Sequence, residues 1–203
     1  MESSAIFPIF YLPPIGYFSE WAKFDDSIEL ELFEHFPKQT YRNRASVYSP
    51  NGILDLIVPV VRGSKVHTKM KDVKISYEFN WQRLHWKSLE SCYRNSAYFE
   101  YYESEFYNFY NKKYEFLCDL NIDILEWLLK QIKWPAQLKF SSEYQKLLAV
   151  DFDFRNALPV RNRENYMKQK PYYQVFEDRH GFIPNLSIVD LLFNQGPQAK
   201  SFI

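Results

Sequence analysis

The sequence predicts an α/β fold, a three-layer sandwich with a mainly parallel sheet, an added β-hairpin and a helical, aromatic-rich section. Three observations support this prediction. The chain opens with a short apolar run, a proline turn and a short helical pattern, which is how an α/β unit begins. A long amphipathic helix near the middle leads through a short turn into a second strand, as in a parallel sheet. Between these parts, Asn51-Gly52 joins two strand-like runs, which is typical of a hairpin.

The first α/β unit covers three predicted elements. Ala5 to Tyr11 is short and apolar, and Leu12-Pro13-Pro14 ends it. Tyr17 to Phe24 has apolar residues at helical spacing, and Ile28 to Phe33 alternates apolar residues with glutamates, one of which is Glu31. The proline turn lies at the carboxyl end of its strand, where open sheets bind ligands. Glu31 is either an acid, a base or an arginine partner in that crevice, or a solvated strand residue.

A cluster of polar residues comes directly before the predicted hairpin strands, 45–48 and 53–61. It contains Lys38, Arg42, Asn43 and Arg44. If residues 41–44 are extended, the two arginines point to the same face, because side chains alternate along a strand. Each guanidinium is a planar donor suited to phosphate or carboxylate, so the pair indicates an anionic ligand. The alternative is that both arginines lie on a solvated face of the hairpin.

The middle of the chain is predicted to be helical. Asn80 is placed to cap a helix that runs to Tyr93, and Trp81 and His85 share one stripe of it. The imidazole of His85 can serve as a general base, because its ordinary pKa lies near neutrality, or it is a packed histidine. The aromatic stretch 96–114 either stacks on sugar rings or bases, or packs against other helices.

The last third combines a helix, a strand and a C-terminal extension. Residues 117–132 form a long amphipathic helix, and 136–140 a returning strand. We expect residues 1–150 to form the core and 151–203 a lid or extension packed on it within one structural domain, with the charged stretch 151–170 as a long loop. Asn185 or Ser187 caps a short helix that carries Asp190; its start either binds an anion or docks a tail helix.

Composition excludes several classes of protein. The 203 residues carry 25 basic and 25 acidic side chains, so no global field favours nucleic acid or an anionic membrane. Two cysteines without a CxxC or a His/Cys cluster predict neither a disulfide framework nor a metal site, and the pattern suits the cytoplasm. No 18-residue apolar window predicts a membrane span, and the absence of GxGxxG leaves no indication of a dinucleotide cofactor. We therefore expect no cofactor. Aromatic residues are 19% of the chain, and some of them should line grooves.

Four blocks, taken together, resemble the WbqC-like protein family over almost the whole chain. They are FPIFYLPPIGYF at 7–18, KQTYRNRASV at 38–47 with NGILDLIVPV at 51–60, WQRLHWKSLESCYRNSAYF at 81–99, and YYQVFEDRHGFIPNLSIVDLLFNQGP at 172–197. Members of that family occur in gene clusters for O-antigen and related bacterial surface polysaccharides, so the resemblance implies a role in making or decorating a glycan. The doubled Pro13-Pro14 and Ile9-Phe10 depart from the usual opening of the family, which affects the role implied for Tyr11. The motif residues that the resemblance carries over are Pro8, Tyr11, Pro13, Gly16, Tyr17, Arg42, Asn43, Arg44, Pro59, Trp81, His85, Tyr93, Tyr173, Gln174, Asn185, Ser187 and Asp190.

These observations predict an anionic small-molecule substrate, a sugar that bears phosphate or carboxylate. One hypothesis is a transferase acting on a nucleotide-activated or lipid-linked amino sugar. In it, His85 moves a proton and Asp190 orients it or binds hydroxyl groups. The expected substrate-binding residues are Lys38, Arg42, Asn43, Arg44, Tyr11, Trp81, Tyr173, Gln174, Asn185 and Ser187. The alternative is a noncatalytic protein that uses the same groove to hold an anionic glycan precursor or to scaffold an assembly.

Overall fold

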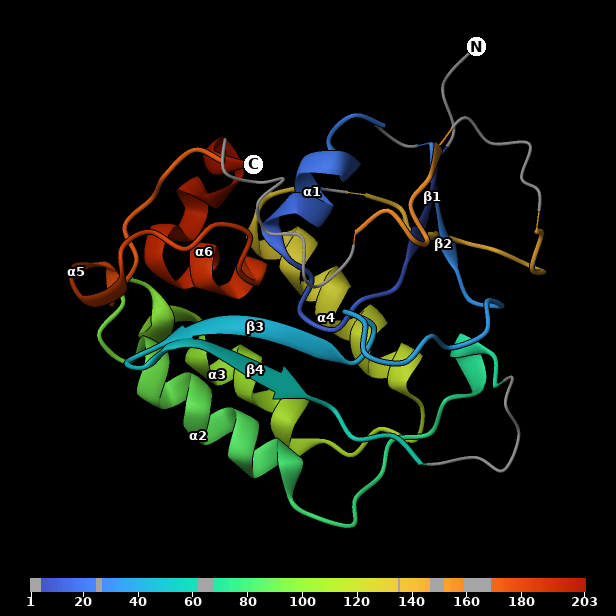
Figure 1. The fold of residues 1–203 in the computed structure, drawn as a ribbon, viewed down its shortest axis with the longest axis horizontal. Helices are drawn as coiled ribbons and strands as arrows, with labels where there is room; N and C mark the ends of the chain where they lie inside the picture. Colours follow the sequence, from blue (N-terminus) through green and yellow to red (C-terminus); the bar gives the residue numbers. More distant parts are fainter. Residues whose placement is uncertain (1–4, 25–26, 62–67, 135, 147–151, 159–168) are drawn as a thin grey trace.

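The fold confirms the α/β prediction. The computed structural model describes residues 5–24, 27–61, 68–134, 136–146, 152–158 and 169–203. It contains a four-stranded parallel sheet, a separate antiparallel hairpin and a group of helices. Figure 1 shows the hairpin across the middle of the molecule. Two helices lie side by side below it, and the parallel sheet lies at the upper right.

The four-stranded sheet has the order β5-β2-β1-β6, and all three strand pairs are parallel. Its strands are β1 (Ala5–Pro8), β2 (Ile28–Glu31), β5 (Lys139–Phe140) and β6 (Phe152–Asp153). The chain first adds β2 and β5 on one side of β1, and then returns to place β6 on the other side. This reversal creates a topological switch point between β1 and β6, and open α/β sheets bind ligands beside such a point, outside the carboxyl ends of the strands.

Helix α1 (Ile15–Trp21) connects β1 to β2 and starts earlier than the sequence pattern predicts. Pro14 stands at its N-cap, where a missing N–H costs no helical hydrogen bond. The ring of Phe7 in β1 packs against Trp21 of α1 on one side and stacks on Phe154, which follows β6, with 4.4 Å between ring centroids. These aromatic contacts hold α1 and the residue after β6 against β1, next to the switch point.

The hairpin consists of β3 (Arg44–Ser49) and β4 (Gly52–Ile57), and Gly52 has the positive φ of 92° that its turn requires. The second strand ends before Pro59, so the predicted strand 53–61 is too long. Residues 41–43 form a turn in which the Asn43 N–H donates to Thr40 O, so the expected extension of residues 41–44 is wrong. The reason is that Arg42 is drawn inward to a buried partner.

Three helices form the aromatic-rich section, namely α2 (Trp81–Tyr93), α3 (Phe99–Asn111) and α4 (Leu117–Gln131). The Asn80 side chain accepts a hydrogen bond from Arg83 N, as a cap should. Phe106 of α3 packs against Trp127 of α4, with 5.0 Å between ring centroids. Much of the aromatic surplus is therefore core packing between helices. A short 3-10 helix (Met70–Asp72) precedes this section.

The C-terminal segment forms α5 (Glu177–His180), α6 (Ile188–Gln195) and a 3-10 helix (Gly196–Phe202). Ser187 caps α6, and its own N–H donates to Ser46 O in β3. Ile188 N donates to Pro13 O in the turn after β1. The end of the chain is thus tied to both the sheet and the hairpin. Most of the predicted lid loop, 151–170, lies outside the described residues.

The described part of the chain lacks both a helix that could span a membrane and a cluster of metal-binding side chains. Among the described residues, no helix combines the length and apolarity needed to cross a membrane. In the same part of the chain, no group of three or more His, Cys, Asp or Glu side chains is arranged to hold a metal ion. Cys92 and Cys118 are both buried free thiols, so they do not pair with each other.

Candidate functional site

Five charged side chains gather where the parallel strands end. We name Glu31, Glu34, Arg42, Asp153 and Arg155 the carboxyl-edge cluster; they follow or end β2 and β6, except Arg42, which comes from the turn before β3. All but Asp153 are buried. Buried charges are expensive unless paired, and such groups concentrate at functional sites. Their position beside the switch point makes this cluster the leading candidate for a ligand site.

Arg42 holds the centre of the cluster. Its Nε and Nη2 donate to the two carboxylate oxygens of Glu34, each at 2.6 Å, and Nη2 also donates to Arg155 O at 2.9 Å. Its guanidinium carbon lies 5.6 Å from the ring centroid of Phe10, just after β1. Burial raises the pKa of Glu34, although the ion pair with Arg42 acts in the opposite direction. Arg42 therefore connects the segments that follow β1, β2 and β6.

Arg155 forms the second half of the cluster. Its Nε and Nη2 donate to both carboxylate oxygens of Asp153, and its Nη1 donates to Glu31 Oε2 at 3.3 Å and to Gln145 O at 2.8 Å. The hydrogen bonds from Arg155 lower the pKa of Asp153. Glu31 Oε1 accepts from Ser141 Oγ at 2.9 Å, so β5 is also connected. Glu31 is accordingly an arginine partner, one of the alternatives for this residue.

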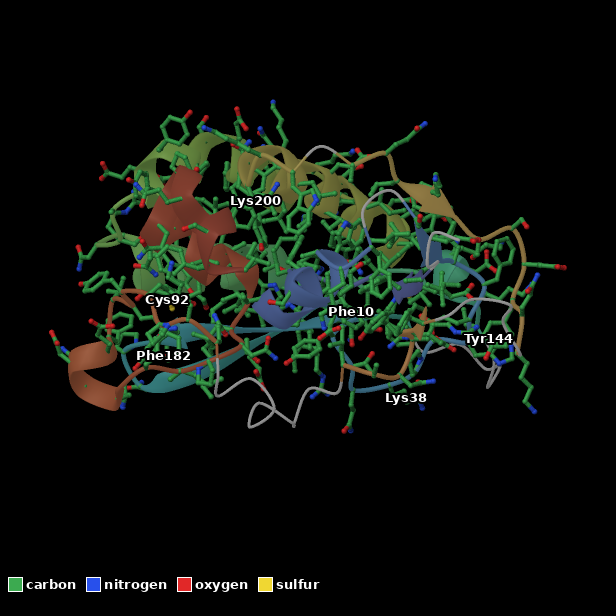
Figure 2. All side chains as sticks on the ribbon, turned by 90° about the horizontal axis from the view of Figure 1, so that it is seen from above. Phe10, Lys38, Cys92, Tyr144, Phe182 and Lys200 are labelled. Atoms are coloured by element: carbon green, nitrogen blue, oxygen red, sulfur yellow. The ribbon has the colours of Figure 1, made fainter. Side chains whose placement is uncertain are left out.

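The cluster has an exposed rim, which we define as His35, Lys38, Tyr144 and Asp153. The Tyr144 side chain is 48% exposed, the guanidinium carbon of Arg155 lies 4.9 Å from its ring centroid, and the ring of His35 stacks over it at 6.4 Å. Figure 2 shows Lys38 and Tyr144 at the same end of the molecule. The rim thus combines an ammonium, a carboxylate and aromatic faces on the open side of the buried ion pairs.

Arg44 differs from Arg42, although one residue separates them. It is half-buried at the first position of β3, and its Nε is shielded from solvent without a hydrogen-bond partner. No hydrogen bond or salt bridge joins its guanidinium to another described residue. The two arginines do not share a face. Arg42 is neutralised internally by Glu34, whereas Arg44 has no carboxylate partner among the described residues.

His85 lies in a buried chain of polar side chains that we name the histidine chain, with Tyr11 and Tyr110. The Tyr11 hydroxyl lies 3.0 Å from His85 Nδ1 and 2.8 Å from the Tyr110 hydroxyl. Burial lowers the pKa of His85 to about 4, and a hydrogen bond with the Ile57 backbone only partly opposes this. The imidazole is therefore neutral at pH 7. Trp81, one turn away, packs against it edge to face at 5.1 Å and is itself buried.

Asp190 lies in a second buried network, the aspartate cluster, with Tyr93, Tyr172 and Gln174. The hydroxyls of Tyr93 and Tyr172 donate to its two oxygens, each at 2.7 Å, and Gln174 Nε2 donates to Tyr172 Oη and to Ile183 O. Burial raises the pKa of Asp190 to about 6, against the effect of these hydrogen bonds. The network joins α2, α6 and the segment before α5, and its carboxylate is sealed from solvent.

Asn185 and Ser187 hold the C-terminal segment on the proline turn. Asn185 Oδ1 accepts from Gly16 N at 2.8 Å, and Ser187 Oγ donates to Leu12 O at 2.9 Å. Asn43 Nδ2 donates to Val58 O at the base of the hairpin. These three side chains therefore make intramolecular contacts that define the fold, and this supports the docking alternative for the start of α6.

The predicted site residues do not open onto one hollow. Lys38 and Tyr173 are exposed and Arg44 is half-buried, whereas the others are buried. The buried ones are Tyr11, Arg42, Asn43, Trp81, His85, Gln174, Asn185, Ser187 and Asp190. The catalytic assignments of His85 and Asp190 stay predictions, and they require these groups to become accessible to a substrate.

Sequence reasoning missed Glu34, Asp153 and Arg155 as site residues. One signal was present, because the stretch 152–155 alternates phenylalanine with Asp153 and Arg155 after an irregular segment, as the end of a strand at a ligand-binding edge would. Glu34 offered no such pattern. Its partner Arg42 lies eight positions away across a turn, and only the fold brings them together.

Comparisons with known proteins agree with the resemblance seen in the sequence. The model of the WbqC-like protein family matches residues 10–154 and 154–202. An uncharacterized protein of Mycobacterium tuberculosis, Rv1507c, is 25% identical over 228 residues, covering 100% of this chain and 98% of its own. No solved structure matches the chain.

Proposed function

The chain belongs to the WbqC-like protein family, and we propose that it acts in bacterial cell-surface polysaccharide biosynthesis of the O-antigen type. The proposed activity is transfer involving an activated amino sugar or another phosphate-bearing glycan precursor, bound at the rim of the carboxyl-edge cluster. The observation that carries this proposal is the position of Arg42, which bridges the segments after β2 and β6 beside the switch point.

Charge and shape at the rim support an anionic sugar as the ligand. At the rim, the exposed ammonium of Lys38 is available for phosphate, and the guanidinium of Arg44, two positions after Arg42, has no ionic partner among the described residues. Tyr144 offers an exposed ring on which a sugar or a base can stack. The side chain of Asp153 is 42% exposed, so its carboxylate can accept hydrogen bonds from sugar hydroxyl groups. In this proposal Arg42 is a positioning residue, because Glu34 already occupies its donors.

The histidine chain and the aspartate cluster have a structural role in this proposal. His85 is neutral and Asp190 is sealed, so in the described conformation they shape and fix the interior. Proton transfer to a substrate is then left to groups at the exposed rim, where the carboxylate of Asp153 can accept a proton.

The test combines binding with chemistry. A thermal-shift screen of nucleotides, nucleotide sugars and simple anions identifies ligands, because one present at 100 times its dissociation constant stabilises the protein by about 2.7 kcal/mol. We expect a nucleotide sugar or sugar phosphate to raise the melting temperature, and mass spectrometry to detect its conversion when an acceptor glycan lipid is added. Lys38→Ala and Arg44→Ala should lose the shift, whereas Arg83→Ala, an exposed arginine on α2, should keep it.

The noncatalytic alternative is distinguished by the same samples. A binding or scaffold protein would show the thermal shift and its loss in the arginine variant, but no covalent change in any ligand. Nucleotide-sugar binding that is unaffected by Lys38→Ala and Arg44→Ala would contradict the site itself.

A further inference from the structure

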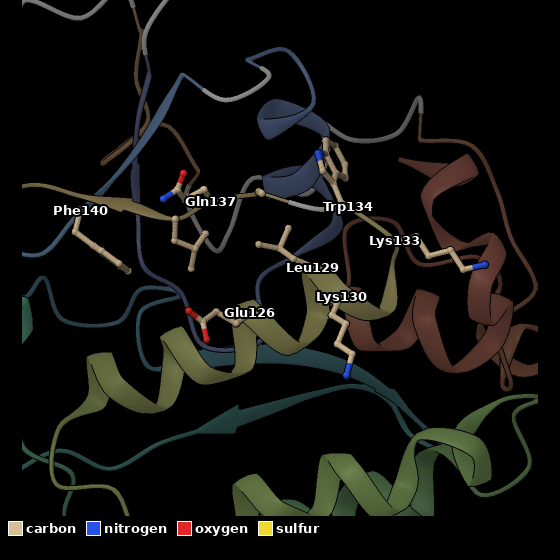
Figure 3. Close-up of a pocket in the computed structure, with 9 residues that line it drawn as sticks. Glu126, Leu129, Lys130, Lys133, Trp134, Gln137 and Phe140 are labelled. Atoms are coloured by element: carbon tan, nitrogen blue, oxygen red, sulfur yellow. The ribbon is translucent and has the colours of Figure 1, made fainter.

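A trench lies along the C-terminal half of α4, and no residue of the carboxyl-edge cluster lines it. It has a volume of about 650 Å³ and runs between α4 and residues 136–140. Its lining includes the apolar side chains of Leu129 and Leu138. Figure 3 shows Phe140 and Trp134 at its two ends. None of the residues assigned above to ligand binding lines it.

The trench runs beside an uncovered sheet edge. In the described part of the chain, β5 pairs with β2 on one side and with no strand on the other. Ser141 N donates to Leu30 O, so the alternation along a strand turns the backbone groups of Leu138 and Phe140 to the opposite, unpaired side. Phe140 is 39% exposed. A bare edge of this kind is a template on which another extended chain can pair.

Charge is concentrated at one end of the trench. Lys130 in α4 and Lys133 just after its end are exposed and have no ion pair with any described residue, and Figure 3 shows both side chains extending away from the backbone. The ammonium of Lys200 lies 4.7 Å from the centroid of the Trp134 ring. The lining of the trench contains two lysines, Lys130 and Lys133, and one acidic residue, Glu126, and Lys200 adds a further ammonium beside it. The excess of positive charge favours an acidic partner.

We infer that the trench is a docking site for an extended acidic peptide segment of a partner protein, which adds to β5 as a further strand. Backbone hydrogen bonds to the unpaired edge supply affinity that does not depend on side chains, and the apolar floor receives alternate side chains. The acidic residues of the segment lie at the Trp134 end, against Lys130 and Lys133. This interaction is independent of the proposed sugar site.

The experiment uses the full chain and a fluorescein-labelled decapeptide of alternating glutamate and valine, with binding followed by fluorescence polarisation. A lysine–valine decapeptide reverses the charge. A third probe is the glutamate–valine peptide methylated on alternate backbone nitrogens, which keeps its charge but cannot form a strand ladder. The variant Lys130→Glu/Lys133→Glu is matched by Arg83→Glu/Lys87→Glu, which makes the same charge change on exposed positions of α2.

We expect wild type and the control Arg83→Glu/Lys87→Glu to bind the acidic peptide. Lys130→Glu/Lys133→Glu should bind it at least about tenfold more weakly. The methylated peptide and the lysine–valine peptide should bind wild type weakly or not at all. Equal binding of the methylated peptide would identify a general polyanion surface and overturn the strand addition. Absence of binding to wild type, or equal losses in both charge-reversal variants, would overturn the docking site.

Discussion

The carboxyl edge of the sheet and the interior face of helix α2 handle buried ionisable groups in opposite ways. At the edge, carboxylates pair with the buried guanidiniums of Arg42 and Arg155 and so compensate the cost of burying them. Along α2, His85 and the cluster around Tyr93 have no counter-charge, so burial itself sets their protonation. The edge therefore pairs its charges next to an exposed rim, whereas along α2 burial disfavours the charged form of each group. A site that must attract an anion belongs to the first kind of environment.

The α2 face shows that burial acts on charge whatever its sign. It lowers the pKa of the base His85 to about 4 and raises the pKa of the acid Asp190 to about 6. The first network loses stability as the pH falls from about 6.5 to 4, since the unfolded state takes up a proton that the folded state refuses. The second loses stability as the pH rises from about 4 to 6, since the folded state keeps a proton that the unfolded state releases. The two effects nearly cancel between pH 4 and 6.

The largest effect should come from breaking a pair at the edge. Arg42→Ala leaves Glu34 buried without its partner, so we expect a loss of about 3–5 kcal/mol in the free energy of unfolding, measured by urea titration at pH 7. Arg42→Met combined with Glu34→Leu removes both charges and should lose much less. Equal losses in the single and double variants would show that packing, and not charge pairing, stabilises the cluster.

The opposite pH responses along α2 can be separated by substitution. Relative to wild type, Asp190→Asn should gain about 3 kcal/mol of stability as the pH rises from 4 to 6, because the Asp190 cost is absent. Relative to wild type, His85→Gln should lose a similar amount of stability as the pH rises from 4 to 6.5, because it lacks the gain that wild type shows in this range. Urea titrations at intervals of pH measure both differences. Parallel profiles for the two variants would refute the opposed pKa shifts.

Removing one hydrogen bond to Asp190 should have a smaller effect. Tyr172→Phe deletes a donor to a buried carboxylate, so we expect a loss of about 1–3 kcal/mol and a further rise in the pKa of Asp190. The upper end of the Asp190 pH response should move to higher pH in this variant. Tyr101→Phe, at a position 76% exposed, is the matched control and should change neither quantity.

The sequence carried the local features of this fold but not its long-range pairs. Asn51-Gly52 predicted the hairpin turn, Asn80 predicted one helix start, and Asn185 or Ser187 a second, of which the structure selects Ser187. Turn and cap chemistry is contained within a few residues. Tyr93 meets Asp190 across 97 positions, which no local pattern encodes. Arg42 was expected on a surface because alternation along a strand was assumed where the chain turns.

The candidate site was predicted only in outline. The carboxyl end of a parallel sheet and an arginine-rich segment before the hairpin were both identified from the sequence, and the structure brings Arg42 to that edge. Asp153 and Arg155 enter the site because β6 crosses back to pair with β1, and the alternation at 152–155 does not specify which strand it pairs with. The sequence identified His85 only as a titratable residue on a helical stripe. Its burial beneath the hairpin depends on the fold and could not be predicted.

Substitutions at the rim should have the smallest effects on stability and the largest effects on ligand binding. Lys38→Ala and Tyr144→Ala change exposed side chains and should alter the free energy of unfolding by no more than about 0.5 kcal/mol. The most direct measurement is the melting-temperature shift of these two variants, wild type and Arg83→Ala with a panel of nucleotide sugars. The account predicts a shift in wild type and Arg83→Ala that both rim variants lose. A shift of equal size in all four proteins would contradict a ligand site at the carboxyl edge.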